Sequence, residues 1–366
     1  MSVRAAVQAG ILLGIVLDLP VVAPLVRRLT GSPQSERVDV DRVPVEVVRP
    51  PGQGPWPAWV FVNGAHPLRR REPVVARLVE GLARAGFLVV APDVPGLGDG
   101  TVTARSVEAT HAVVAASVER PDVRNGQVAL VGASTGAGLA LLAASSPRVA
   151  GRISVVAAVV PFADLRKLIC LATTSAYEED GRFARFEVTD LHRLVVARSL
   201  AATLPEAAER EQLLAALAEI EREALNPLEE LPRRGEPRSG EARAVLRLLA
   251  NRDPERFGEL FDALPQPVRA FVGELSPLRA CRALGAPVEI VVPPLDTYFA
   301  PGEARSLITA LPQARLTVTR VLDHTRPTAS LAGLRGLIAL LGFALRGIEA
   351  AGRRPAVGAP RLRRKT

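Results

Sequence analysis

A serine with the surroundings of a catalytic nucleophile lies in the segment Gly132-Ala-Ser-Thr-Gly136. A short apolar run, Gln127 to Val131, comes before this segment, and an Ala/Leu-rich stretch follows it up to Ala144. The pattern G-x-S-x-G between a strand and a helix is typical of a nucleophile elbow, a strained turn that lifts the serine hydroxyl clear of the sheet. We therefore expect Ser134 to attack an acyl carbon.

A serine nucleophile needs a general base, because its hydroxyl is too weakly acidic to attack unaided. The chain has four histidines. His324 follows the last expected strand, which puts it on a loop at the carboxyl edge of the sheet, where open α/β sheets bind their ligands. His66 directly follows a strand and could line a pocket, His192 lies in a helical region where it could contact substrate, and His111 lies within a helix, where a structural role is expected. These positions favour His324 as the base.

Asp296 is the acid that we expect to orient His324. It follows the strand before the last one, in Val291-Val-Pro-Pro-Leu-Asp296, again on a loop at the carboxyl edge. The chain order Ser134, Asp296, His324 is the order expected for a nucleophile elbow with its triad. Asp164, just past the strand that ends near residue 160, is the alternative acid.

The oxyanion of a tetrahedral intermediate needs fixed N–H donors. The amide of Thr135, next to the nucleophile, is one candidate donor. The other is expected from the amide of Ala65, because a strand ends at Asn63-Gly64 and the next amide faces the site. Asn63 and His66 are therefore candidates for lining the substrate pocket.

The positions of these residues depend on strands that alternate with helices. Period-2 or β-rich runs predict strands at residues 37–48, 59–62, 87–91, 127–131, 153–160, 288–292 and 315–321. Helical runs lie at residues 73–85, 104–118, 134–144, 301–311 and 330–348. This alternation predicts an α/β fold with a mostly parallel, doubly wound sheet that is covered on both faces.

The alternation stops between residues 162 and 286, where no good strand is found. Residues 206–225 carry leucine and isoleucine at helical spacing, and residues 232–240 read as a turn or loop. We expect an inserted helical block. Its apolar side chains are candidates for an acyl or alcohol pocket, with Phe162 and Tyr177 the aromatic ones.

The N-terminal residues 1–35 are expected to form a separate apolar segment. Residues 5–26 are largely apolar, but Asp18, Pro20 and Pro24 interrupt them, and the run from Ala5 to Leu17 is shorter than the ~20 residues of a membrane span. The pattern favours a helix that packs on the domain or lies at a membrane surface, and a transmembrane anchor is the alternative. We expect a basic, disordered tail at residues 351–366.

Composition excludes some classes of function. The chain has 366 residues, 48% of them hydrophobic and 23% charged, which is typical of a globular protein. Its net charge of +8 comes from arginines spread along the chain, and aromatic residues make up only 4%, so we expect no nucleic-acid partner. Cys170 and Cys281 have neither metal-ligand spacing nor a disulfide framework, and no metal or cofactor is expected.

With these features assembled, residues 36–348 resemble the α/β-hydrolase family. The likeness rests on Asn63-Gly-Ala65 in place of the family's His-Gly turn, on Val89 to Asp99, on Gly132 to Gly136, and on Asp296 and His324 after their strands. The resemblance implies a serine hydrolase core at residues 36–161 and 287–350, with residues 162–286 as a helical lid after the sixth strand of the sheet. It also implies that Asp93 is a structural residue that holds loops together.

The expected activity is hydrolysis of a carboxylic ester or related acyl bond through an acyl-enzyme, with an apolar small molecule as substrate. Two alternatives stay open: a catalytically silent scaffold with this fold, and an acyltransferase or perhydrolase that uses the same triad. We expect a cytoplasmic protein, with membrane association through residues 5–26 as an alternative.

Overall fold

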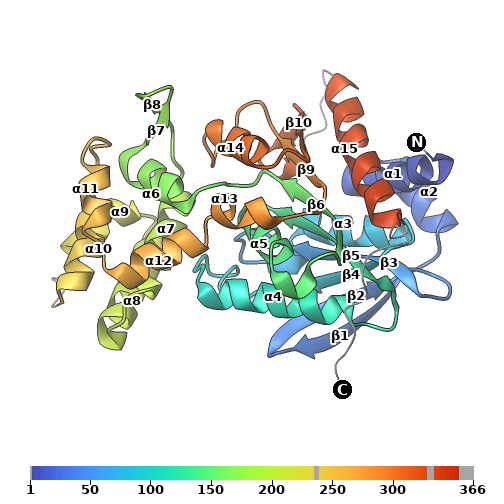
Figure 1. The fold of residues 1–366 in the computed structure, drawn as a ribbon, viewed down its shortest axis with the longest axis horizontal. Helices are drawn as coiled ribbons and strands as arrows, with labels where there is room; N and C mark the ends of the chain where they lie inside the picture. The colour runs from blue at the N-terminus through green and yellow to red at the C-terminus, as the bar shows by residue number, and fades with distance from the viewer. Residues whose placement is uncertain (1, 235–238, 328–333, 354–366) are drawn as a thin grey trace.

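A mixed sheet of eight strands is the centre of the molecule (Figure 1). The computed structural model describes residues 2–234, 239–327 and 334–353. The strand order is β1-β2-β4-β3-β5-β6-β9-β10, and only the pairs β1–β2 and β2–β4 are antiparallel. The strands are β1 (Gln34–Val40), β2 (Val43–Arg49), β3 (Trp56–Val62), β4 (Leu88–Pro92), β5 (Val123–Ala133), β6 (Ile153–Val159), β9 (Val288–Val292) and β10 (Ala314–Val318). The predicted α/β fold with a mostly parallel sheet is confirmed.

The expected single edge strand at residues 37–48 is wrong, because the chain turns back within it. Asp41 and Arg42 both adopt positive φ, 50° and 65°, and β1 pairs with β2 through Val40 and Val43. Two consecutive residues of this kind make the tight turn that suits a hairpin. The alternating pattern runs through both strands and hides the turn between them.

Helices cover both faces of the sheet, as predicted. Alternate residues of β3 show the two faces: Ala58, Val60 and Val62 pack in one apolar cluster, and Trp59 and Phe61 pack in another. The first face is covered by α4 (Ala104–Val118) and α5 (Thr135–Ala144), and the second by α1 (Val3–Val16), α3 (Pro73–Arg84) and α15 (Leu334–Gly352). The helix α14 (Gly302–Ala310) connects β9 to β10.

The N-terminal segment folds as two helices that lie on the domain, next to α3 and α15 (Figure 1). These are α1 and α2 (Val22–Leu29). Leu12 of α1 packs so closely on Gly81 that a β-carbon there would lie 3.0 Å from the leucine Cδ1. No helix in the described ranges is long and apolar enough to cross a membrane.

The helical insertion lies between β6 and β9, after the sixth strand of the sheet. Its elements are α6 (Leu165–Thr174), β7 (Ala176–Glu179), β8 (Arg182–Arg185), α7 (Asp190–Ala202), α8 (Ala207–Arg222), α9 (Pro227–Glu230), η3 (Leu231–Arg233), α10 (Gly240–Ala250), α11 (Phe257–Asp262), α12 (Gln266–Glu274), α13 (Pro277–Ala280) and η4 (Cys281–Ala283). The expectation that this region holds no strand is wrong, since β7 and β8 form a short antiparallel hairpin. A disordered tail was expected from residue 351, but α15 continues to Gly352. Residues 354–366 of this expected tail lie outside the described residues.

Candidate active site

Ser134 occupies the turn between β5 and α5 in a left-handed conformation, with φ 52° and ψ −124°. L-residues rarely adopt this region, and such strain is concentrated at functional sites. The flanking glycines make the turn possible. A β-carbon on Gly132 would lie 2.4 Å from the Gly136 carbonyl oxygen, and one on Gly136 would lie 2.2 Å from the Val62 carbonyl oxygen. The local geometry is therefore that of a nucleophile elbow.

His324 and Asp296 are joined by a hydrogen bond, with 2.8 Å between Nδ1 of the histidine and Oδ2 of the aspartate. The carboxylate can only accept, so Nδ1 donates and Nε2 is left as the basic nitrogen. The other oxygen of Asp296 accepts from the backbone amides of Tyr298 and Phe299, both at 2.7 Å. Both aromatic rings also lie against the imidazole, with centroid distances of 4.4 and 5.5 Å. The acid is thus fixed by its own loop, and it fixes the histidine.

A single cavity of about 590 Å³ contains the predicted nucleophile and base. This volume lies within the usual range for small-molecule sites. The predicted oxyanion residues Ala65 and Thr135 line it, as do the pocket candidates Asn63 and His66. The structure therefore brings these six residues together at one edge of the sheet.

The loop after β3 is held directly against the nucleophile. A β-carbon on Gly64 would lie 3.2 Å from Cβ of Ser134 and 3.1 Å from the Ala133 carbonyl oxygen. The buried side chain of Asn63 braces the loop, because its Nδ2 donates to the Gly64 carbonyl at 2.8 Å. The amide of His66 donates to the Leu97 carbonyl at 2.9 Å. These contacts give the backbone around Ala65 a fixed position in the cavity.

His192 enters the same cavity from the first turn of α7. It is 6% exposed, and neither ring nitrogen has a hydrogen-bond partner among the described residues. Its ring lies edge-on to Phe299 at 6.1 Å. Burial, and then the nearby His324, lower the pKa of His192 from 6.5 to about 4. His192 is therefore an uncharged imidazole that faces the substrate space.

Two candidates do not reach the site. Asp164, the alternative acid, is the N-cap of α6: its Oδ1 accepts from the Arg166 amide at 2.9 Å. Tyr177 was expected in the substrate pocket but lies in the β7–β8 hairpin, where its ring packs on Phe186 at 6.2 Å. The hairpin turns Tyr177 away from the cavity and toward the surface cleft beside α14.

Two further residues take structural positions next to the site. Phe162 was expected in the substrate pocket but does not line the active cavity: it packs edge-on against Phe299 at 6.1 Å and lines a separate small cavity of about 60 Å³. Asp93 forms an ion pair with Arg70, which also binds Glu46 at 3.2 Å. Asp93 thus ties the loop after β4 to the loop after β3, as the resemblance implied.

The buried carboxylate of Glu303 could not be recognised from the sequence. It lies in the first turn of α14 and accepts from the amides of Ala163 and Asp164 at 2.6 and 3.0 Å. Burial raises the pKa of Glu303, against the lowering effect of these hydrogen bonds. This contact fixes the start of the insertion to the edge of the sheet.

No metal site is indicated in the described ranges, where no three His, Cys, Asp or Glu side chains could hold a metal ion together. Cys170 and Cys281 are both unpaired. Burial raises the pKa of both thiols, so neither is poised to react as a thiolate.

Comparison with solved structures finds a similar fold in a known hydrolase. The structure of a 2,6-dihydroxy-pseudo-oxynicotine hydrolase matches with a TM-score of 0.51 and 17% identity, over 92% of this chain and 73% of that one. A proline iminopeptidase from Mycobacterium smegmatis matches with a TM-score of 0.45 and 18% identity, over 87% of this chain and 100% of that one. The Pyrococcus furiosus esterase Pf2001 gives a TM-score of 0.46 and 14% identity, over 87% and 94%.

In sequence, no curated protein matches the chain. A family model described as X-Pro dipeptidyl-peptidase (S15 family) matches residues 39–240, which is more than half of the chain. The matched stretch contains the strands β2 to β6 of the sheet, the nucleophile elbow and the first part of the insertion. The chain therefore belongs to the S15 family of serine hydrolases and has the α/β-hydrolase fold.

Proposed function

We propose that the protein hydrolyses carboxylic esters through the triad Ser134, His324 and Asp296. The observation that carries this proposal is the 2.8 Å hydrogen bond between His324 and Asp296. His324 lines the same cavity as Ser134, whose backbone has a positive φ of 52°. A serine, a histidine and an acid from three separate loops share one sheet edge here. This arrangement serves acyl transfer.

In the first step Nε2 of His324 takes the proton of the Ser134 hydroxyl as its oxygen attacks the acyl carbon. Asp296 stabilises the imidazolium that forms and keeps the ring in the required tautomer. The oxyanion of the tetrahedral intermediate is placed at the amides of Ala65 and Thr135. The imidazolium then gives its proton to the leaving alcohol, which leaves an acyl-enzyme.

In the second step a water molecule attacks the acyl-enzyme, and His324 again takes the proton. Ser134 is released with the proton that the imidazolium returns, and the carboxylic acid leaves. An acceptor other than water would convert the same cycle into acyl transfer. Product analysis with a competing alcohol measures how the acyl group is divided between the two acceptors.

The helical insertion is proposed to act as a lid that influences substrate choice. Leu191, His192 and Val195 of α7 line the active cavity from this side. The insertion is held to the core by its own contacts, such as the Ser199 hydroxyl that accepts from the Val102 amide at 3.0 Å. Substitutions on this face of α7 should therefore change which esters are accepted.

Cleavage of X-Pro dipeptides from peptides is a second candidate function, because the family model carries that description. Such a reaction requires a site for the charged amino terminus of the peptide. Glu72 and Asp323 are the carboxylates among the described residues that line the cavity, and Glu72 already caps α3 through the Val74 and Val75 amides at 2.7 and 3.0 Å. The mainly apolar lining therefore favours an ester.

A fluorophosphonate probe and p-nitrophenyl butanoate test the proposal together. We expect the probe to label the wild type but not Ser134→Ala. Asp296→Asn and His324→Ala should each lower turnover by about a thousandfold or more. Asp164→Asn is the matched control, because asparagine caps a helix as well as aspartate does, and it should leave turnover near the wild type.

Several outcomes would contradict the proposal. A folded protein that does not label is a scaffold, and a loss of turnover in Asp164→Asn but not in Asp296→Asn means that the acid is wrong. Faster cleavage of an X-Pro p-nitroanilide than of any ester would establish the peptidase function instead.

A further inference from the structure

The active cavity continues from Ser134 into the space between the sheet and three helices. We call this part the inner cavity. Its sheet side consists of Trp59, Phe61, Val131 and Ala157. Its helix side consists of Leu12, Leu13 and Val16 from α1, Val75, Leu78 and Leu82 from α3, and Leu340, Phe343, Ala344, Gly347 and Ile348 from α15.

The inner cavity follows β3 back from the active-site edge. Asn63, Phe61 and Trp59 line it in turn, and all three contribute to one continuous cavity with Ser134. Four residues of a strand extend about 13 Å, at ~3.3 Å per residue. An extended alkyl chain rises by about 1.3 Å per carbon, given C–C bonds of ~1.5 Å. The inner cavity therefore has the depth for about ten carbons.

Small residues keep this space open. Gly347 faces Trp59, and a β-carbon there would lie 3.5 Å from the indole ring, at ordinary contact distance. Ala157 and Ala344 lie on the sheet side and on the helix side. Larger side chains at these positions would fill the space, as they do in a close-packed core.

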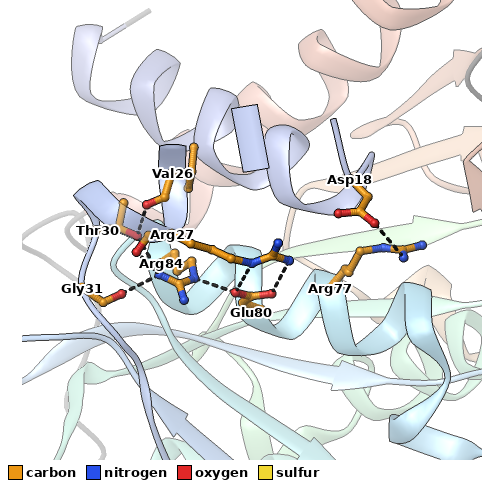
Figure 2. A network of polar contacts seen from close by, with 8 residues as sticks. All are labelled: Asp18, Val26, Arg27, Thr30, Gly31, Arg77, Glu80 and Arg84. Atoms are coloured by element: carbon orange, nitrogen blue, oxygen red, sulfur yellow. Dashed lines mark hydrogen bonds and ion pairs between the residues drawn. The ribbon is translucent and has the colours of Figure 1, made fainter. Parts of the chain in front are cut away.

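The N-terminal helices are fixed in place as one side of this cavity. Figure 2 shows the polar contacts that join α2 and the residues around it to α3. Arg27 binds both carboxylate oxygens of Glu80 at 3.0 and 3.1 Å, and Arg84 binds Glu80 at 2.7 Å. Arg84 also donates to the carbonyl oxygen of Gly31 at 2.6 Å. Asp18 and Arg77 form an ion pair at 3.6 Å at the other end of the network.

We propose that the inner cavity binds an unbranched acyl chain of about ten carbons while its carboxyl carbon lies at Ser134. The proposal rests on the ester hydrolase function above and names its substrate class. The side chains that line the inner cavity are hydrocarbon apart from the indole N–H of Trp59, a buried donor with no hydrogen-bond partner among the described residues, so an alkyl chain suits most of its length. The alcohol part of the ester then leaves on the side of His192 and Leu191, which line the same cavity.

The test compares p-nitrophenyl esters of increasing acyl length on the full chain. For the wild type we expect kcat/KM to rise from butanoate to about decanoate, by up to about fourfold per methylene, as expected for ~0.8 kcal/mol per buried CH₂. Gly347→Leu should lower the ratio of kcat/KM for decanoate to that for butanoate at least about tenfold. Gly347→Ala is the matched control, because its β-carbon fits, and it should keep the wild-type profile.

Binding to an inactive protein separates this inference from the proposed function. We expect Ser134→Ala to bind sodium decanoate more tightly than butanoate in calorimetry, and Ser134→Ala/Gly347→Leu to lose that preference. If no ester is cleaved but this preference is found, the proposed function is wrong and the chain site stands. The chain site is wrong if esters are cleaved but kcat/KM does not depend on acyl length, and Ser134→Ala binds decanoate no more tightly than butanoate. Should Gly347→Leu fail to fold, the wild-type profile and the Ser134→Ala binding decide the question.

Discussion

At the scale of single residues, His192 gives the stability of the protein a pH dependence. Burial first, and then the neighbouring His324 and Arg193, lower the pKa of His192 to about 4, while Asp296 acts in the opposite direction. In the unfolded chain a histidine titrates near its ordinary value of ~6.5. Between these values the unfolded state binds more protons, so the free energy of unfolding falls as pH decreases from about 6.5 to about 4.

His192→Phe should remove part of this dependence, because phenylalanine keeps the packing on Phe299 but does not titrate. Urea unfolding at pH 7 and pH 5 measures it: we expect the variant to lose less free energy of unfolding between the two pH values than the wild type. His111, whose pKa is also lowered by burial, contributes equally in both proteins. Equal losses in the two proteins would show that the His192 imidazole is not held uncharged by the fold.

The residues of the proposed triad could be selected from the sequence because each follows a predicted strand, and parallel strands end at one edge. The residues that hold the triad were harder to recognise. The amides of Tyr298 and Phe299, two and three residues after Asp296, donate to its carboxylate. Aspartate favours local turns of this kind. His192 was expected in a helical region where it could contact substrate, but its exact position in the cavity depends on how α7 packs on the core.

At the scale of elements, Glu80 is the residue that joins α2 to α3. Burial raises its pKa, but hydrogen bonds from Arg27 and Arg84 outweigh this effect and hold the pKa below its ordinary value. The contribution of Glu80 to stability is therefore complete above the ordinary carboxyl pKa and is lost as pH falls through the lowered one.

Glu80→Gln should lower the free energy of unfolding by about 1 kcal/mol. This value is smaller than that of a fully buried hydrogen bond to a charged group, because Glu80 is partly exposed to solvent. Urea unfolding at pH 7 measures the change. Glu219→Gln is the matched control and should be nearly neutral, since within the described ranges Glu219 pairs only with Arg222 and Arg234, at 3.9 and 3.8 Å on the surface. Equal effects of the two substitutions would mean that the N-terminal helices are not held by Glu80.

The two hairpins show why some elements were missed. In β7–β8 the turn is Asp180-Gly181, both residues with positive φ, and Asp-Gly is a strong hairpin signal that the helical composition around it concealed. In β1–β2 the turn is Asp41-Arg42, which carries a weaker signal. Strand and helix positions in the core were predicted well because each has a long apolar run with a clear period.

At the scale of the whole molecule, the sheet and the insertion share one apolar core. A single cluster of buried residues includes Leu130 of β5 together with Leu200, Leu217 and Phe271 of the insertion. Lid insertions can be loosely attached, but a shared core of this kind couples their stability to that of the sheet.

We expect the sheet and the insertion to unfold in one transition. The chain has two tryptophans, Trp56 and Trp59, and both lie in β3, so tryptophan fluorescence reports on the sheet. Far-UV circular dichroism reports largely on helices, many of which lie in the insertion. Urea titrations followed by the two signals should have coincident midpoints. An earlier midpoint by circular dichroism would show that the insertion unfolds independently.

The packing of α1 between α3 and α15 also affects how the protein is made. On the ribosome α15, which covers α1, is translated more than 300 residues after it. Until then α1 can pack on α3, but the part of its surface that α15 covers in the finished protein has no partner. Nascent chains of this protein should therefore engage chaperones or targeting factors that recognise apolar helices throughout most of synthesis.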